Sequence, residues 1–298
     1  MKLGSGGRSR PQRRSDGGKA ALFIAPGLLM IVVFSYYPVI RSLVGAFTSW
    51  DGFNTPLFNG LANFWALAHD PVFLASLWHV GLWVIIAVPL AIIPSFVVAE
   101  LVFNLKSAGA QRIYRVAFVL PMVLPAVVPI LLWEFGIYDP GGILDRILGV
   151  STEWLLGPRT ALWAMILMGF PWVSPFNFLI LIAGLQNVDA SIFDAAHIDG
   201  ASLRQRVIHV DVPMVLGQVK LLLVLAVLGS SQNLLVPLLL TGGGPMNATM
   251  TPVLDMYQSA FVGDQYGYAM AISLVMFVLI MILTLVNMRF FNPPSSDG

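Results

Sequence analysis

The chain has 298 residues, of which 57% are hydrophobic and only 10% are charged. A soluble domain carries roughly 25% charged residues, so this composition excludes an ordinary soluble protein and indicates a membrane protein. The net charge of +1 gives no indication of nucleic-acid binding, and the absence of cysteine excludes disulfides and thiolate metal sites. The four histidines have no zinc-like spacing, so we expect neither a metal nor another cofactor.

A short basic segment comes first in the chain. Residues 1–19 hold six Lys and Arg among Gly and Ser, a composition that predicts a disordered cytoplasmic tail. We expect residues 20–291 to form a transmembrane domain and residues 292–298 a second tail. The first apolar segment, residues 20–40, is too long for a signal peptide and has no small-x-small cleavage site, so it predicts a first transmembrane helix.

Six apolar segments are long enough to cross the bilayer. At 1.5 Å per residue, about 20 residues span the hydrocarbon core of roughly 30 Å. The sequence therefore predicts an all-α membrane protein with six transmembrane helices. The predicted spans are residues 20–40, 77–98, 116–133, 161–185, 221–240 and 268–288.

The distribution of Lys and Arg predicts the orientation. With the N-terminus in the cytoplasm, thirteen of these residues lie inside, and only Arg41, Arg146 and Arg159 lie outside. Basic residues gather on the cytoplasmic side of membrane proteins, so both termini are predicted to be cytoplasmic. The outward loops would then be residues 45–76, 136–160 and 241–267.

Prolines interrupt several of the predicted spans. Each removes a backbone donor and tends to kink its helix, and the freed carbonyls then need other partners. We therefore expect kinked helices around a wet or mobile interior. These prolines are Pro89 and Pro94, then Pro121, Pro125 and Pro129, then Pro171 and Pro175, and finally Pro237.

A polar segment of about twenty residues separates the fourth and fifth spans. Asp189 or Ser191 can cap a first helix, and Gly200 stands where that helix would end in a left-handed residue. Ser202 and Gln205 have capping-box spacing and restart a helix. We therefore expect two short helices with a bend at Gly200.

This segment resembles the cytoplasmic loop of ABC importer permeases. That loop reads Glu-Ala-Ala, three residues, Gly, nine residues and Ile-x-Leu-Pro. Here it stands as Asp194-Ala195-Ala196, Gly200 and Val210-Asp211-Val212-Pro213, with the spacing intact. In the family the loop, residues 186–213 here, is a coupling helix that docks into a cytoplasmic ATPase. The alternative is an ordinary polar connector. The resemblance implies docking through Asp194, Ala195, Ala196, Asp199, Gly200 and Pro213.

Two polar clusters interrupt the apolar spans. Polar side chains inside a membrane are costly unless they face protein or water. Amide and hydroxyl groups beside an aromatic ring suit a polyhydroxylated ligand, but small polar residues also join membrane helices by hydrogen bonds. Both interpretations stay open here. The residues are Trp172, Ser174 and Asn177 in the fourth span, and Ser230, Ser231, Gln232 and Asn233 in the fifth.

Two further segments narrow the resemblance. Phe47-Thr48-Ser49-Trp50, after Pro26 and Tyr37-Pro38, is similar to the opening of carbohydrate permeases of the maltose and glycerol-phosphate type. A Gly-Gly-Gly-Pro run alone indicates only a turn. In this chain the run stands directly after the fifth span, and in that position it resembles the external segment of one of the two permeases in such importers. The resemblance implies contact with an extracytoplasmic binding protein through Thr241, Gly242, Gly243, Gly244 and Pro245.

The resemblance extends from about residue 21 to residue 290 and implies the fold of type I ABC importer permeases. It implies a sugar or sugar-like solute, and a bacterial or archaeal cytoplasmic membrane. The expected partners are a second similar permease, an ATPase dimer, a solute-binding protein and membrane lipid. The sequence has no phosphate-binding Gly-x-x-x-x-Gly-Lys-Ser/Thr motif, so we expect a transport subunit and not the ATPase itself.

Three alternatives remain. An importer for an amino acid or phosphate would share the coupling loop but not the segment after the fifth span. An ion-coupled carrier needs an ionisable residue deep in a span. His79 is a weak candidate near an outer end, while Glu100 and Glu134 lie at span ends within reach of water. An intramembrane enzyme needs a converging set of catalytic groups, and none is visible.

Overall fold

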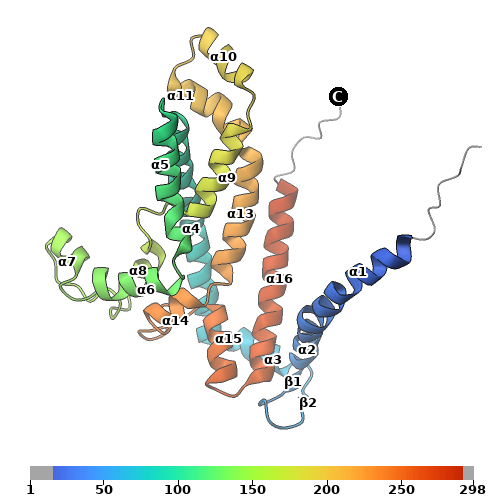
Figure 1. Ribbon diagram of the computed structural model, residues 1–298. Helices are drawn as coiled ribbons and strands as arrows, with labels where there is room; N and C mark the ends of the chain where they lie inside the picture. Colours follow the sequence, from blue (N-terminus) through green and yellow to red (C-terminus); the bar gives the residue numbers. More distant parts are fainter. Residues whose placement is uncertain (1–15, 291–298) are drawn as a thin grey trace, which may run out of the picture.

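The computed structural model describes residues 16–290, and its first element is a long helical rod (Figure 1). The rod consists of α1 (Asp16–Ile31), a π-helical turn η1 (Val32–Tyr36) and α2 (Tyr37–Gly45). Every residue from 21 to 40 is exposed. Because helix α1 begins at Asp16, it includes the last residues of the predicted tail; residues 1–15 and the predicted C-terminal tail lie outside the described residues.

A small hairpin and a short helix connect the rod to the next span. Strand β1 (Thr48–Ser49) pairs antiparallel with β2 (Leu57–Phe58), and α3 (Ala62–His69) follows. The amide of Asn63 donates hydrogen bonds of 2.9 Å to the carbonyls of Ala46 and Thr48, which fixes the hairpin against α3. This is the only sheet among the described residues.

The second predicted span is part of a longer helix, α4 (Pro71–Phe103). It starts before the predicted residue 77 because Asp70 caps it, accepting a 2.8 Å hydrogen bond from the backbone N–H of Val72. Its 33 residues correspond to about 50 Å, more than the hydrocarbon thickness of about 30 Å. Pro89 and Pro94 lie inside this helix without ending it.

The third predicted span is bent, and a straight helix over residues 116–133 is wrong. The two halves meet at 90° around residues 124–126, where Pro125 follows a 3₁₀ turn that contains Pro121. The missing N–H groups of these prolines explain the break. The elements are α5 (Ala108–Val119), η2 (Leu120–Val123), α6 (Val127–Leu132) and the π-helical η3 (Trp133–Ile137), after which α7 (Ile143–Leu148) lies in a loop.

The fourth and fifth predicted spans are also interrupted. Residues 168–174 separate α8 (Ala161–Leu167) from α9 (Pro175–Gln186), and residues 232–234 separate α13 (Leu216–Ser231) from α14 (Leu235–Leu240). Pro171 and the left-handed Gly169, with φ +98°, prevent a continuous fourth helix. The breaks expose backbone at mid-molecule, which membranes tolerate only where protein or water covers it.

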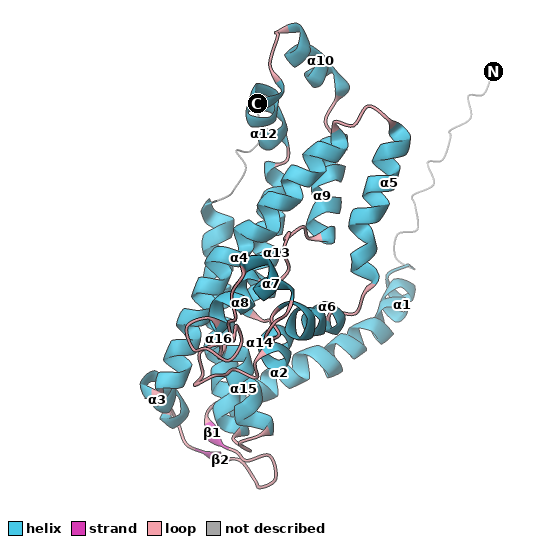
Figure 2. Ribbon diagram, turned by 90° about the vertical axis from the view of Figure 1, so that its left-hand side faces the viewer, coloured by secondary structure: helices cyan, strands magenta, loops and turns pink. Residues whose placement is uncertain are grey.

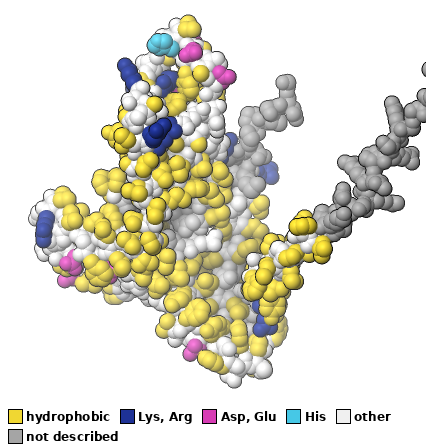
Figure 3. Space-filling model, in the orientation of Figure 1, with side chains coloured by type: hydrophobic (Ala, Val, Ile, Leu, Met, Phe, Trp, Pro, Cys, Tyr) yellow, Lys and Arg dark blue, Asp and Glu magenta, His cyan; other side chains and the backbone are white. Residues whose placement is uncertain are grey.

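The two ends of the molecule carry different short elements (Figures 1 and 2). At one end lie α10 (Ala190–Ile198), α11 (Leu203–Arg206), the π-helical η4 (Val207–Asp211) and α12 (Val212–Met214). At the other lie the hairpin, α3 and α15 (Pro252–Phe261), which leads into the last span, α16 (Tyr266–Phe290). Figure 3 shows mainly hydrophobic side chains between the ends and basic ones near α10 and α11.

Three clusters of buried residues hold the helices together. One joins α4, α9 and α13 around Phe178 and Leu222, a second joins α4, α6, α8 and α14 around Trp83, and a third joins α2, α3, α4 and α16 around Ile272. By length and composition the described residues contain three helices able to cross a membrane, or up to six if each bent pair counts as one span. The all-α, multi-span prediction is confirmed.

Candidate functional site

The predicted bend in the coupling loop, residues 186–213, forms from local sequence signals. The carboxylate of Asp189 accepts a 2.9 Å hydrogen bond from the N–H of Ser191 at the start of α10, and this bond lowers the pKa of Asp189. Helix α10 ends at Ile198, and Gly200, two residues further on, has a left-handed φ of +71°. Ala201 N–H donates to the carbonyl of Ala196 at 3.0 Å, the bonding pattern of a Schellman cap. The left-handed glycine and the bend are as predicted.

The second half of the loop restarts as the sequence predicts. Ser202 and Gln205 form the complete capping box at the start of α11, with the Ser202 N–H donating to the Gln205 side chain at 2.8 Å. Pro213 lies in the first turn of α12, which continues directly from η4. The loop is therefore a defined knuckle of two short helices and a turn.

Most of the predicted docking residues lie on the surface of this knuckle. Asp194, Ala195, Asp199, Gly200 and Pro213 are exposed, and Ala196 is half-buried. Two apolar side chains that the sequence reasoning missed accompany them: Ile198 is 85% exposed and Leu203 is 60% exposed. Exposed apolar side chains among polar ones, at the tip of the molecule, are typical of a surface that contacts another protein.

A buried cluster of charges attaches the knuckle to the spans. The guanidinium of Arg206 pairs with Asp211 at 3.1 Å and with Glu100 of α4 at 3.3 Å, and it also donates to the side-chain oxygen of Asn104. Asp211 is fully buried and Glu100 is 7% exposed. The expectation that water reaches Glu100 is therefore wrong, because α11 and η4 cover it. We call Arg206, Glu100, Asn104 and Asp211 the Arg206 cluster.

Aromatic packing extends this attachment. The Arg206 guanidinium lies 5.5 Å from the ring centroid of Phe193 on α10, and the Phe193 ring lies 5.5 Å from that of Phe103 on α4. Such cation–aromatic and aromatic pairs stabilise a contact by roughly 0.5–2 kcal/mol. No sequence signal indicates this arrangement, since Glu100 and Arg206 are 106 residues apart.

A pocket of about 290 Å³ lies at the breaks in the fourth and fifth spans. Of the seven predicted substrate-path residues, Trp172, Ser174 and Asn233 line it. Trp172 has a left-handed φ of +56°, and its indole N–H donates to the carbonyl of Leu167 at 3.0 Å. The pocket combines an indole, a hydroxyl and an amide with apolar walls. We call it the Trp172 pocket. The rest of its lining comes from Trp83, Ala87, Leu90, Ala91, Met165, Ile166, Met168, Gly169, Val173 and Val236.

The other four predicted path residues do not line this pocket. Asn177 is 7% exposed and donates a 3.0 Å hydrogen bond to the carbonyl of Ala91 on α4, so it joins two helices. Ser231 is buried, Ser230 is half-buried and Gln232 is exposed. The helix-joining interpretation therefore fits the geometry of Asn177, and the ligand interpretation fits that of the three pocket residues.

The glycine-rich segment after α14 is a tight, well-anchored turn. Thr249, which is fully buried, donates to the carbonyl of Gly244 at 2.9 Å and lies 2.6 Å from the hydroxyl of Thr241. Gly243 has a φ of +90°, and a side chain there would clash with Met250. Of the five predicted contact residues, Thr241, Gly244 and Pro245 are half-buried, Gly242 is exposed and Gly243 is buried.

The residues considered for ion-coupled transport or metal binding can be placed in the structure. His79 lies near the N-terminal end of α4, and its Nδ1 is 2.9 Å from the carbonyl of Met250. Within residues 16–290, no three His, Asp or Glu side chains lie close enough together to hold a metal ion.

Broken membrane spans, a mid-molecule pocket and an exposed helical knuckle at one end define a multi-span transport subunit. Residues 91–294 match the family described as binding-protein-dependent transport system inner membrane component. This match covers more than half of the chain, which therefore belongs to that family.

Individual relatives agree with this assignment. The chain is 30% identical over 281 residues to the probable ABC transporter permease protein YesP of Bacillus subtilis, covering 92% of this chain and 90% of that protein. It is 29% identical to the sulfoquinovosyl glycerol transport system permease protein SmoG of Agrobacterium fabrum, covering 91% and 89% of the two chains. Its fold is similar to a chain of a bacterial ABC transporter that imports the polysaccharide alginate, with a TM-score of 0.79 at 17% identity, covering 94% and 98%.

Proposed function

We propose that this chain is one of two permease subunits of an ATP-driven sugar importer in the cytoplasmic membrane of a bacterium or archaeon. Family membership supports a binding-protein-dependent transporter, and the predicted topology, which groups Arg204 and Arg206 of the knuckle with most of the other Lys and Arg, favours the knuckle side as cytoplasmic. The observation that carries the proposal is the knuckle itself. It exposes Asp194, Ala195 and Gly200 at one end and is fixed to α4 by the Arg206 cluster.

The knuckle suits contact with an ATPase dimer. Small residues around Gly200 allow close approach of another backbone, and Ile198 and Leu203 supply apolar area. ATP-driven closure of the dimer would move α10. The Arg206 cluster would then carry this displacement to α4 and, through Asp211, to α12 and α13. The bundle would thereby shift between inward-open and outward-open states.

The Trp172 pocket suits a polyhydroxylated solute. Trp172 offers an aromatic face for the apolar side of a sugar ring, and Ser174 and Asn233 offer hydrogen-bonding groups. The names of SmoG and of the alginate transporter support a carbohydrate. This chain does not enclose the pocket, and the helical rod is exposed over residues 21–41, as expected if a second permease completes both.

The test is substitution at Gly200 in the reconstituted transporter. A Cβ there meets no atom within 4 Å, so Gly200→Val changes only the left-handed backbone and the exposed face. A β-branched residue in this conformation costs about 1–2 kcal/mol, whereas Asn tolerates it. We expect Gly200→Val to assemble in the membrane but to lose sugar uptake and stimulated ATP hydrolysis.

Gly200→Asn is the matched control. Loss of uptake in the Val variant alone would assign the effect to the backbone bend, and loss in both would assign it to side-chain bulk at the docked surface. Wild-type uptake and ATP hydrolysis in Gly200→Val would contradict the coupling role.

A further inference from the structure

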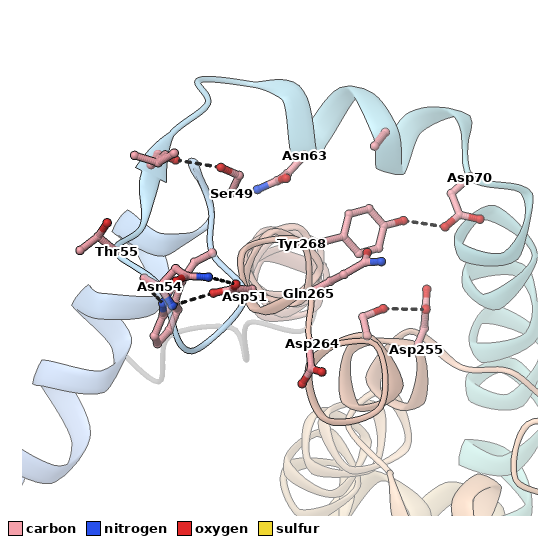
Figure 4. Close-up of a pocket in the computed structure, with 14 residues that line it drawn as sticks. Ser49, Asp51, Asn54, Thr55, Asn63, Asp70, Asp255, Asp264, Gln265 and Tyr268 are labelled. Carbon is pink, nitrogen blue, oxygen red and sulfur yellow. Dashed lines mark hydrogen bonds between the residues drawn. The ribbon is translucent and has the colours of Figure 1, made fainter.

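A large polar pocket lies at the end of the molecule opposite the knuckle (Figure 4). Its volume is about 910 Å³, and its walls come from the β1–β2 hairpin, α3, α15 and the start of α16. Four aspartates line it: Asp51, Asp70, Asp255 and Asp264. We call it the acidic pocket.

None of the residues that line the pocket is basic. The pocket is built from two stretches of the chain, and the sequence has no Lys or Arg between residues 42 and 105 or between residues 221 and 288. The carboxylates of the first and third outward loops therefore converge on one site without a counter-charge in those stretches. A concave site lined by one sign of charge concentrates the field and attracts groups of the opposite charge.

Two of the four carboxylates, those of Asp51 and Asp70, accept hydrogen bonds from neighbouring groups of the chain. Asp51 accepts hydrogen bonds of 2.9 and 2.5 Å from the backbone N–H and side-chain amide of Asn54. Asp70 caps α4 through the N–H of Val72 at 2.8 Å, and its second oxygen accepts a 2.6 Å bond from the hydroxyl of Tyr268. These groups are structural as well as acidic.

Asp255 is different. It is only 8% exposed, and it projects from α15 toward Tyr268 and Asp70 in Figure 4. One of its oxygens accepts a weak 3.4 Å bond from Ser259, and the other, Oδ2, has no hydrogen-bond partner. Burial and the neighbouring charge of Asp70 raise the pKa of Asp255 to about 6. A buried carboxylate oxygen without a donor is unfavourable, so this site lacks a cationic or hydrogen-bond donor group.

We propose that the acidic pocket is the anchor for a Lys or Arg side chain of the extracytoplasmic solute-binding protein, which donates to Asp255 Oδ2. This rests on the proposed function, which places that protein at this end. A metal ion is a poorer occupant, because no three acidic or histidine side chains among residues 16–290 come close enough together to hold one. A single ammonium or guanidinium group needs only one carboxylate partner and gains from the remaining negative charge.

The experiment compares two variants that each remove one negative charge from the pocket. Asp255→Asn removes the buried, unpartnered carboxylate with almost no change in shape. Asp264→Asn removes an exposed carboxylate whose left-handed φ of +50° asparagine tolerates. The purified, labelled solute-binding protein of the same transporter is titrated onto the complete complex in lipid nanodiscs at several salt concentrations.

We expect Asp255→Asn to raise the Kd about tenfold and to weaken its salt dependence, and Asp264→Asn to raise it no more than about twofold. Thermal unfolding of the complex that carries Asp255→Asn should occur no lower than in the wild type, since the substitution removes a buried charge. Reversing the charge of the contacting Lys or Arg in the binding protein should cause the same loss of affinity. In the double variant the two losses of affinity should not add.

The outcomes separate the two proposals. If Asp255→Asn leaves binding unchanged, or if both variants weaken binding equally, the proposed anchor is wrong. The proposed function is unaffected by either result. A wild-type complex that neither binds a solute-binding protein nor depends on one for uptake overturns the proposed function and the anchor with it.

Discussion

Replacing Arg206 with Met tests the connection between the knuckle and the spans. Met keeps much of the side-chain length but removes the charge, so the carboxylates of Glu100 and Asp211 lose their cation. The Glu100 side chain is 10% exposed and that of Asp211 is fully buried. Removing one partner of a buried ion pair costs about 3–5 kcal/mol, because the remaining charge stays buried and unpaired. Since the Arg206 side chain is 20% exposed, we expect the lower end, about 3 kcal/mol.

The assay has two readouts. Thermal unfolding of the purified complex measures stability, and uptake per ATP hydrolysed measures coupling. Arg204→Met is the matched control, because this neighbour is exposed on the same short helix and forms no ion pair with the described residues; we expect a change within about 0.5 kcal/mol. The triple variant Arg206→Met, Glu100→Gln, Asp211→Asn also removes the orphaned charges, so most of the stability should return.

Coupling should not return with stability. In the triple variant the knuckle no longer has an ionic link to α4, so uptake per ATP should stay low. Wild-type coupling in the triple variant would refute the idea that the Arg206 cluster transmits the motion. Wild-type stability in Arg206→Met alone would refute the burial and pairing on which the magnitude depends.

Two further predictions concern the spans and the acidic pocket. Asn177→Ala should lower the stability of the complex by about 1 kcal/mol through loss of the bond to the Ala91 carbonyl, whereas Gln232→Ala, at an exposed position, should leave thermal unfolding unchanged. Equal unfolding temperatures for both variants would contradict the helix-joining role. Asp255, with a pKa of about 6 against an ordinary 3.8, binds its proton more tightly in the folded chain. The contribution of Asp255 to folding stability should therefore fall as pH rises from about 4 to 6 and then level off. Asp255→Asn should abolish this slope and, at pH 7, stabilise the complex by at most about 3 kcal/mol. An unchanged slope in thermal unfolding against pH would contradict the assignment.

The local features of the coupling loop were predictable because each depends on neighbouring residues. Asp189, Gly200, Ser202 and Gln205 form caps and a turn with backbone groups no more than a few positions away. For the same reason the presence of apolar spans could be predicted from composition alone. Their straightness could not, because a proline can either sit inside a helix, as Pro94 does, or end one, as Pro125 does.

The roles of the polar residues in the spans depended on distant partners. Asn177 and Asn233 look alike in sequence, yet Asn177 donates to the carbonyl of Ala91 on α4 and Asn233 lines the Trp172 pocket. No periodicity or spacing distinguishes them, since the difference lies in which helix packs against each.

The sequence by itself determined that this is a multi-span membrane protein with a bent polar loop of the ABC permease pattern, since hydropathy and capping act within a few turns of chain. Only the tertiary structure decided where the charges meet. Arg206 reaches Glu100 across 106 residues, and Tyr268 reaches Asp70 across 198. Contacts at such separations depend on how the helices pack, and packing is a property of the whole bundle.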